Sequence, residues 1–278
     1  MTRRGSLLGH ILRHAVLLAG LVIMLAPFVW MISTSLKPPN EIFSTKLGLL
    51  PTNWAAVENY TKAFTKVPLL RYLLNGVIVT AGIFFLQLIV SLPAAYALAK
   101  LQFRGRDILF TMVLIGLMIP AQAPAIPRYV MLYELGLLDS YAALILPFVF
   151  SAFGIFLMRQ FFKTVPDDLI HAARLDGLGE FEILWRIMLP LAMPAMLAFG
   201  VISIVSHWND FFWPLIVIQT GDLATPPLGT LFFRNEEAGS DFGPLMAGTV
   251  VITAPLVLLF LAAQRRFIEG VTLSGIKG

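Results

Sequence analysis

The segment from Thr164 to Gly177 contains the residues whose types and spacing best suit a defined molecular task. Thr164, with Asp167 three residues later, matches a helix N-cap followed by an acidic residue. Pro166 lies between them, where it suits the first turn of a helix. Gly177 is the residue type that ends a helix in the left-handed conformation. We therefore predict a short surface helix over residues 164–179.

Apolar and charged side chains recur in this predicted helix at helical spacing, on different faces. The predicted apolar face comprises Val165, Leu169, Ala172 and Ala173. The polar residues offset from it are Asp168, His171 and Arg174. The small side chains of Ala172 and Ala173 let another surface come close, which favours docking of a partner protein. Contact with lipid headgroups is the alternative, and the residues alone do not decide between the two.

The whole chain has the composition of a membrane protein. Apolar residues make up 58% of its 278 residues and charged residues 13%. Soluble domains average about 45–50% apolar and roughly 25% charged residues. This composition excludes intrinsic disorder and argues against a soluble enzyme. The chain has no cysteine and only four scattered histidines, so we expect no metal site.

Six stretches without Asp, Glu, Lys or Arg are long enough for a membrane-spanning helix, which needs about 20 apolar residues. They cover residues 15–36, 72–99, 108–127, 140–158, 187–209 and 242–264. We predict an all-α membrane protein with six transmembrane helices, forming a single domain over residues 1–278. The helix at 164–179 then lies between spans four and five. Lysine and arginine are more frequent in the segments that are inside if both termini are cytoplasmic.

The contents of the spans narrow the class of transporter. Each span contains proline, which bends helices and is tolerated in membranes when neighbouring helices satisfy the freed backbone groups. No span contains Asp, Glu, Lys or Arg, whereas ion-coupled carriers usually keep ionisable groups within the membrane. The neutral polar groups inside the spans fit a path for a hydroxyl-rich solute. A passive membrane scaffold fits them equally well.

Several motifs together resemble the permeases of binding-protein-dependent ABC importers. His171-Ala172-Ala173, Asp176-Gly177 and Ile187-Met188-Leu189-Pro190 are similar to the family loop E-A-A-x-x-x-G-x(9)-I-x-L-P. Further similar segments are Asn75-Gly76, Ala95-Tyr96-Ala97-Leu98-Ala99, Ile119-Pro120-Ala121-Gln122, Trp208-Asn209, Gln264-Arg265-Arg266-Phe267 and Gly275-Ile276-Lys277-Gly278. They cover nearly the whole chain and resemble the carbohydrate branch, in particular the smaller, maltose-permease-like subunit.

The resemblance implies the partners and the compartment. In such importers two permease subunits form the translocation path, two ATP-binding subunits dock on the cytoplasmic side, and an extracytoplasmic solute-binding protein delivers the solute. The expected location is the bacterial cytoplasmic (inner) membrane, with multiple spans and both termini cytoplasmic. The chain has no G-x-x-x-x-G-K-[ST] loop, so ATP and Mg²⁺ belong to the partner ATPase. We expect no cofactor in this chain, no enzymatic activity of its own and no nucleic-acid partner.

The resemblance also implies which residues contact the ATPase. The matching residues are Ala172, Ala173, Asp176 and Gly177, with His171 at the first position of the motif. Asp167 or Asp168, one turn earlier, would supply a negative charge that His171 lacks. The C-terminal tail, residues 265–278, would contact the ATPase pair through Gly275, Lys277 and Gly278. His171 departs from the family, which has glutamate there. A neutral histidine accepts one hydrogen bond but has no fixed negative charge. The departure therefore puts the family's salt bridge in doubt and leaves the docking expectation in place.

The expected solute is a sugar, an oligosaccharide or a polyol. Aromatic rings stack on sugars, and amide side chains bond to hydroxyl groups in both directions. The candidate path residues are Gln122, Tyr129, Trp208 and Asn209. Helix packing or anchoring at the membrane surface is the alternative role of each. Glycerol phosphate or a glycerophosphodiester is the nearest alternative solute, and an ion-coupled sugar carrier is the alternative mechanism.

Overall fold

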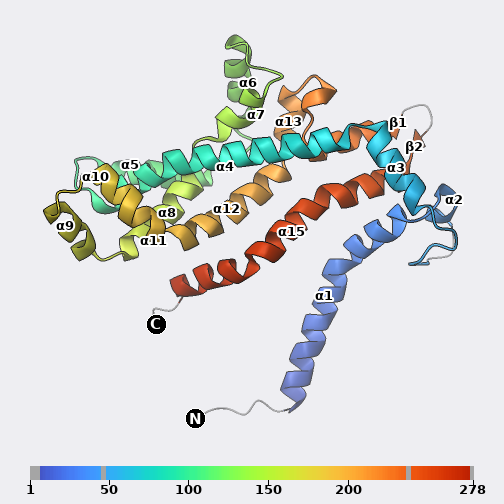
Figure 1. Ribbon diagram of the computed structural model, residues 1–278, viewed down its shortest axis with the longest axis horizontal. Coiled ribbons are helices and arrows are strands. Elements are labelled where there is room, and N and C mark those ends of the chain that lie inside the picture. The colour runs from blue at the N-terminus through green and yellow to red at the C-terminus, as the bar shows by residue number, and fades with distance from the viewer. Residues whose placement is uncertain (1–6, 45–47, 236–238, 276–278) are drawn as a thin grey trace. The chain divides into compact units, whose positions relative to one another are not determined.

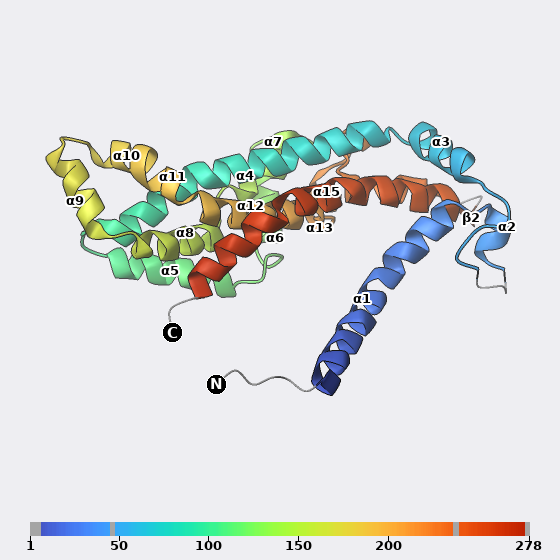
Figure 2. The same ribbon diagram turned by 60° about the horizontal axis from the view of Figure 1, so that its bottom comes forward.

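The computed structural model describes residues 7–44, 48–235 and 239–275, and nearly all of its regular structure is helical (Figures 1 and 2). The chain divides into two compact units. One comprises Met1–Leu69 with Thr230–Ala254, and the other comprises Leu70–Gly229 with Pro255–Gly278. The predicted all-α class is confirmed, with one short antiparallel strand pair in addition.

A buried amide and an ion pair hold the first unit together. Its elements are α1 (Leu7–Ser35), α2 (Pro39–Ile42), α3 (Ala56–Lys66), η4 (Thr230–Phe233), β1 (Arg234–Asn235), β2 (Gly239–Ser240) and the first part of α15 (Phe242–Gly275). The Asn59 Nδ2 group donates to the carbonyls of Ser35 and Lys37, both at 2.9 Å. Lys66 Nζ lies 2.8 Å from Asp241 Oδ2. These contacts fix α3 against the end of α1 and the start of α15.

The second unit contains the predicted docking helix. Its elements are α4 (Leu69–Lys100), α5 (Arg106–Met118), α6 (Ala125–Glu134), α7 (Tyr141–Ile145), η1 (Leu146–Phe148), α8 (Ala152–Thr164), α9 (Asp167–Leu175), α10 (Glu180–Ile183), the π-helical η2 (Leu184–Met188), α11 (Leu189–Leu191), α12 (Met193–Trp208), α13 (Phe212–Val217), η3 (Gly221–Leu223), α14 (Pro226–Gly229) and the remainder of α15. Within it, α8 packs against α5 and α12, and α13 packs against α6 and α7. Figures 1 and 2 show α4 running along this bundle, with α9 and α10 beyond one end.

Asn75, near the start of α4, joins three segments of the second unit. Its Nδ2 group donates to two carbonyl oxygens of the 222–224 loop, at 2.9 Å each. Its Oδ1 accepts a hydrogen bond of 2.6 Å from the Tyr141 hydroxyl. The next residue, Gly76, lies so close to the Pro226 ring that a Cβ atom would come within 2.6 Å of it. The Asn75-Gly76 motif therefore has a packing role.

Neutral polar side chains within α4 and α12 bond to one another. The Ser203 hydroxyl donates to Gln87 Oε1 at 2.7 Å, and the Gln87 amide donates to the carbonyl of Phe148 at 2.9 Å. Both side chains are buried. Hydrogen bonds of this kind join helices in an apolar environment, where an unpaired polar group is costly. These two side chains therefore join α4 to α12 and to the backbone at Phe148.

Three described helices are long and apolar enough to cross a membrane: Gly9–Ser35, Leu69–Lys100 and Phe242–Ala262. Two bent pairs bring the number to as many as five. One joins Tyr141–Phe148 to Ala152–Thr164 at 44°, and the other joins Glu180–Leu191 to Met193–Trp208 at 76°. Five of the six predicted spans therefore correspond to helices or bent helix pairs of suitable length and composition.

The third predicted span, residues 108–127, is not one continuous helix. Helix α5 has 13 residues and ends before Ile119, whose backbone is extended. At 1.5 Å per residue it is about 20 Å long, less than the roughly 30 Å of a hydrocarbon core. Pro120 and Pro124 explain the interruption, because the residue before a proline is disfavoured in the helical conformation. The count of six spans remains a prediction.

Candidate functional site

Helix α9 forms at the predicted place, and its end has the predicted cause. The backbone of Gly177 is left-handed, with φ of 85°. The Leu178 N–H bonds to the carbonyl of Ala173 at 3.0 Å, and the Gly177 N–H bonds to that of Arg174 at 3.1 Å. These two bonds are the Schellman arrangement that closes a helix on a glycine. The last turn of α9 is therefore fixed by its own sequence.

The start of α9 differs from the prediction. The helix begins at Asp167, and the preceding residue, Pro166, makes no capping side-chain bond. Thr164 is the last residue of α8, and its hydroxyl donates to the carbonyl of Phe161 at 2.7 Å. The predicted N-cap at Thr164 is wrong for that reason, because its hydroxyl is already engaged in the preceding helix. The helix covers Asp167–Leu175, a shorter segment than 164–179.

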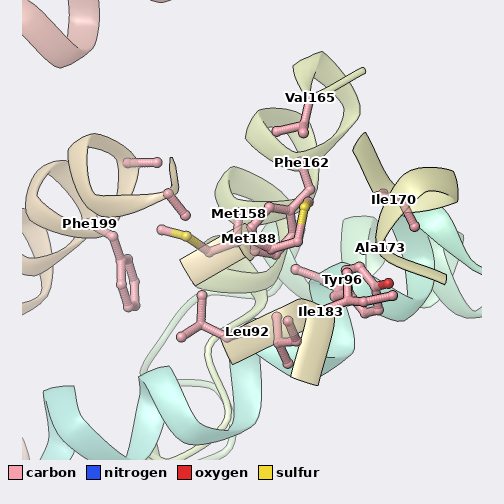
Figure 3. Close-up of a cluster of buried hydrophobic side chains, with 14 residues drawn as sticks. Leu92, Tyr96, Met158, Phe162, Val165, Ile170, Ala173, Ile183, Met188 and Phe199 are labelled. Carbon is pink, nitrogen blue, oxygen red and sulfur yellow. The ribbon is translucent and has the colours of Figure 1, made fainter. Parts of the chain in front are cut away.

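One face of α9 is buried in the core of the second unit. Ile170 is 2% exposed and Ala173 is 3% exposed. They belong to a cluster that includes Tyr96, Phe162 and Ile183, drawn from α4, α8 and α10 (Figure 3). Within the Ala172–Ala173 pair, Ala173 therefore packs inward, where its small side chain lets α9 lie close to the bundle.

The opposite face of α9 is open. Asp168, His171, Ala172 and Leu175 are all exposed, and Leu175 has 88% of its surface accessible. The predicted apolar face is thus divided: Val165 and Ala173 are buried, while Leu169 and Ala172 are exposed. Asp176 and Gly177 are also exposed. A free apolar side chain of this size, on a helix fixed from behind, is suited to contact with another protein.

Lys100, the last residue of α4, holds the start of α9. Its side chain is 5% exposed. Its Nζ donates at 2.6 Å to both Asp167 Oδ1 and the carbonyl of Val165. The hydrogen bond and the positive charge of Lys100 lower the pKa of the Asp167 carboxyl below its ordinary value. The ammonium therefore satisfies both a carboxylate of α9 and a carbonyl of the connection from α8.

Tyr96, one turn earlier on α4, reaches the other end of α9 through Glu180. The Tyr96 hydroxyl donates to Glu180 Oε2 at 2.6 Å, and Arg174 Nε donates to Glu180 Oε1 at 2.7 Å. Arg174 belongs to the last turn of α9, and Glu180 begins α10. We call Tyr96, Lys100, Asp167, Arg174 and Glu180 the α4 clamp. Sequence reasoning missed it. A tyrosine and a lysine one turn apart at the end of an apolar helix were the available signal.

The predicted solute-path residues do not form one site. Trp208 is 4% exposed and packs against the backbone at Gly76. Tyr129 packs with the cluster around Trp213. Asn209 is exposed, and its side-chain amide donates to the carbonyl of Val205 at 2.8 Å. The contacts described for these three residues are side-chain packing and a hydrogen bond at a helix end, and none of them indicates a solute site.

Gln122 lines a pocket with a volume of about 220 Å³. Arg128, His207 and Asp210 line the same pocket with aromatic rings, among them Phe148. The Arg128 guanidinium lies 5.5 Å from the centroid of the Phe148 ring. Burial lowers the pKa of Arg128, and among the described residues no carboxylate forms an ion pair with it. No spacing pattern could indicate this grouping, because its members come from separate segments of the chain.

The tail residues fall at or beyond the limit of the described structure. Helix α15 continues to Gly275, and Lys277 and Gly278 lie outside the described residues.

Comparison with known proteins places the chain in a family. Residues 87–272 match the model of the binding-protein-dependent transport system inner membrane component. The chain belongs to this family. It is therefore a membrane component of a transport system, in agreement with the resemblance seen in its sequence.

Relatives and a solved structure share nearly the whole length of this permease-family chain. It is 34% identical over 254 residues to the arabinooligosaccharides transport system permease protein AraQ of Halalkalibacterium halodurans, covering 91% of each chain. It is 32% identical over 270 residues to the lactose transport system permease protein LacG of Rhizobium radiobacter, covering 97% of each. It is 31% identical over 269 residues to the sn-glycerol-3-phosphate transport system permease protein UgpE of Brucella abortus, covering 94% and 95%. A bacterial ABC transporter that imports the acidic polysaccharide alginate superposes with a TM-score of 0.84, at 25% identity, covering 96% of this chain and 99% of the other.

Proposed function

We propose that the chain is one of two permease subunits of an ATP-driven importer for a carbohydrate. In this proposal it forms half of the translocation path and takes its energy from a separate ATPase that binds ATP and Mg²⁺. An extracytoplasmic binding protein delivers the solute. Family membership and the sugar-transporting relatives support the proposal. An ion-coupled sugar carrier is disfavoured because this family depends on a binding protein.

The open face of α9 is the observation that carries the proposal. Its exposed residues lie on a short helix whose opposite face is buried. The buried face holds the helix in place, so the exposed residues project from the bundle in a fixed arrangement. In this proposal Asp168, His171 and Ala172 contact the ATPase through this face. Asp176 and Gly177, which are exposed just after the helix, contact it at the helix end. Ala173 supports the helix from behind. This face combines an apolar side chain, Leu175, with an acidic one, Asp168. Such a combination suits a cleft on an ATPase subunit better than a membrane surface.

A pull-down from native membranes tests the docking. A tagged full-length chain should co-purify with an ATPase that mass spectrometry identifies, and Leu175→Asp should abolish this because it places a charge in the contact. Leu135→Asp is the matched control, since Leu135 is 62% exposed and belongs to the end of α6. Loss of the ATPase with the control, or retention with Leu175→Asp, contradicts docking through α9.

His171 offers a second test of the same contact. If the ATPase keeps the basic group that pairs with the family's glutamate, His171→Glu should assemble at least as well as the natural chain. His171 is exposed, so the change leaves the fold intact. The measurement is the amount of ATPase recovered per tagged chain. Failure of the complex to assemble would mean that the cleft is built around histidine.

We further propose that both termini and α9 lie on the cytoplasmic side of the inner membrane. The excess of lysine and arginine in the corresponding segments supports this orientation. The chain contains no cysteine, so single introduced cysteines report cleanly on accessibility. A cysteine at exposed His171 should react with a membrane-impermeant maleimide only in inside-out vesicles. Reaction in intact spheroplasts would reverse the assignment.

The pocket lined by Gln122 is the proposed contact of this chain with its solute. Its volume suits about one sugar ring, and it combines aromatic rings with amide, imidazole and charged groups. Gln122→Ala should raise the solute concentration at half-maximal uptake in proteoliposomes and leave assembly unchanged. Asn209→Ala is the control, because Asn209 bonds only within its own helix in the described structure.

Arg128 favours a second candidate solute, one with an anionic group. A half-buried guanidinium without a carboxylate partner is suited to bind a phosphate or a sugar carboxylate. Relatives named for sn-glycerol-3-phosphate and for alginate import are consistent with this candidate. Arg128→Gln should reduce uptake of an acidic solute strongly and of a neutral sugar little. Equal effects on glycerol 3-phosphate and a neutral disaccharide would remove this candidate.

A further inference from the structure

We propose that Tyr96 and Lys100 are positioning residues that make α9 move as one body with α4. The proposal rests on the proposed function, in which α9 receives the force of the ATPase. It adds which residues of this chain connect α9 to α4. The α4 clamp would transmit the motion of α9 directly to a long apolar helix of the bundle.

Helix α4 is bonded to both ends of α9. Lys100 holds its first residue, Asp167, and also the carbonyl of Val165, just before the helix. Tyr96 holds Glu180, which in turn binds Arg174 in the last turn of the helix. A body held at one end can pivot about that point. A body held at two ends by the same helix must follow it.

The four hydrogen bonds of the α4 clamp all involve charged groups. The Lys100 and Arg174 contacts are charge-assisted, and the Tyr96 hydroxyl donates to a carboxylate, so all are of the stronger kind. Three of them measure 2.6 Å and the Arg174–Glu180 bond measures 2.7 Å. The Lys100 side chain is 5% exposed, which limits competition from water. The partners are 67 and 84 positions apart along the chain, so the bonds join separate elements.

Apolar packing of the Tyr96 ring accompanies these hydrogen bonds. The Tyr96 ring packs edge-on against Phe162, at 6.3 Å between ring centroids, in the cluster that contains Ile170 and Ala173 of α9 (Figure 3). The ring therefore supports α9, while the hydroxyl reaches past it to Glu180. Tyr96→Phe removes the hydroxyl and leaves the packed ring in place, which makes it a selective variant.

Hydrogen exchange measures whether the clamp holds α9, without reference to transport. The natural full-length chain, Tyr96→Phe, Lys100→Met and the double variant are compared in lipid nanodiscs. Amides of residues 170–178 should exchange about ten- to a hundredfold faster in each single variant, the size expected for loss of a hydrogen bond to a charged group. The double variant should exceed the product of the two single effects, because either grip alone still restrains the helix.

Matched controls separate the clamp from general loosening. Tyr133→Phe removes a hydroxyl from a tyrosine that is 64% exposed, and Lys163→Met removes a charge from an exposed lysine at the end of α8. Neither should change exchange in α9. Lys100→Arg retains a cation with several donors and should restore slow exchange. Unchanged α9 exchange in the double variant would overturn the proposal.

The second measurement is the number of ATP molecules hydrolysed per solute imported by the reconstituted complex. Clamp variants should assemble with the ATPase normally, yet hydrolyse several-fold more ATP per solute, and Lys100→Arg should return the ratio to that of the natural chain. Faster exchange with an unchanged ratio would show that α9 need not follow α4, and would overturn the proposal. If the natural complex shows no ATP-dependent uptake, the proposed function fails, and the exchange result still decides whether α4 holds α9.

Discussion

Ala173 and Ala172 have the same side chain and opposite surroundings. Ala173 is 3% exposed against the bundle, whereas Ala172 faces away from it. The sequence analysis assigned both alanines to one apolar face, together with Val165 and Leu169. The buried face of α9 in fact contains Ile170 and Ala173, so the predicted face was rotated relative to the observed one. Ile170, absent from that predicted face, is the residue that decides the orientation, at 2% exposed.

Gly177 leads to a prediction about backbone conformation. Its φ of 85° is unfavourable for residues with a side chain, and a β-branched residue is the least suited to it. A Cβ atom there would meet nothing within 4 Å, so the effect is conformational. Gly177→Val should destabilise the end of α9 by about 1–2 kcal/mol or more and raise ATP hydrolysis per solute imported.

Gly177→Asn is the control for this prediction, since asparagine tolerates the left-handed conformation better than other side chains. It should retain most of the coupling. Natural uptake and hydrolysis in Gly177→Val would show that the conformation of this turn is unimportant for transport.

The lowered pKa of Asp167 leads to a prediction about how α9 responds to acidic pH. Its pKa is lowered in the folded chain by Lys100, so the folded state favours the ionised form. The contribution of this pair is present above the ordinary pKa, about 4, and is lost as the pH falls through the lowered value. Hydrogen exchange at the start of α9, corrected for its intrinsic pH dependence, should therefore accelerate on acidification below about pH 4. Lys100→Met should remove this acceleration, and its persistence would mean that another group is responsible.

At the scale of elements, the approximate position of α9 could be predicted from the sequence, but the contacts that hold it against α4 could not. Gly177 ends the helix through local bonds, which a sequence pattern can reveal. The start depends on whether the Thr164 hydroxyl serves α8 or α9, and that choice follows from the length of α8. The contacts with α4 join residues 67 and 84 positions apart, so no local pattern could indicate them.

The bend before α12 leads to a prediction about proline. The segments on either side of Ala192 meet at 76°, and Pro194 stands at the start of α12. A proline there cannot donate to the carbonyl of Pro190, and its ring clashes with that carbonyl in a continuous helix, at a cost of about 3 kcal/mol. Pro194→Ala should therefore reduce the bend. Spin labels at exposed Phe181 and at Ile202 would report an increased separation, and an unchanged distance would assign the bend to packing.

At the scale of the whole molecule, the apolar spans differ in how much of their surface the chain itself covers. No residue in the most apolar window of Gly9–Ser35 is buried, compared with 33% for Leu69–Lys100 and 17% for Phe242–Ala262. Hydropathy alone predicts all three spans and does not distinguish them.

The C-terminal end leads to a prediction about the assembled importer. Helix α15 continues to Gly275, and the resemblance assigns Gly275, Lys277 and Gly278 to a contact with the ATPase pair. Deleting residues 274–278 should lower solute-stimulated ATP hydrolysis in the reconstituted complex and leave membrane insertion and binding-protein affinity unchanged. Unaltered stimulation would show that the tail makes no functional contact.

The amide of Asn75 also bears on the chemical lifetime of the protein. An asparagine followed by glycine is the pair most prone to lose ammonia, because the next backbone nitrogen can attack the side-chain carbonyl to form a cyclic imide. Here Asn75 is 1% exposed, lies in a helix and uses its side chain in three hydrogen bonds. The folded chain is thereby protected from deamidation. A chain that stayed unfolded long enough to form the imide would carry aspartate or isoaspartate at position 75 after hydrolysis. Its carboxylate would then face the two carbonyl oxygens that the Asn75 amide now contacts.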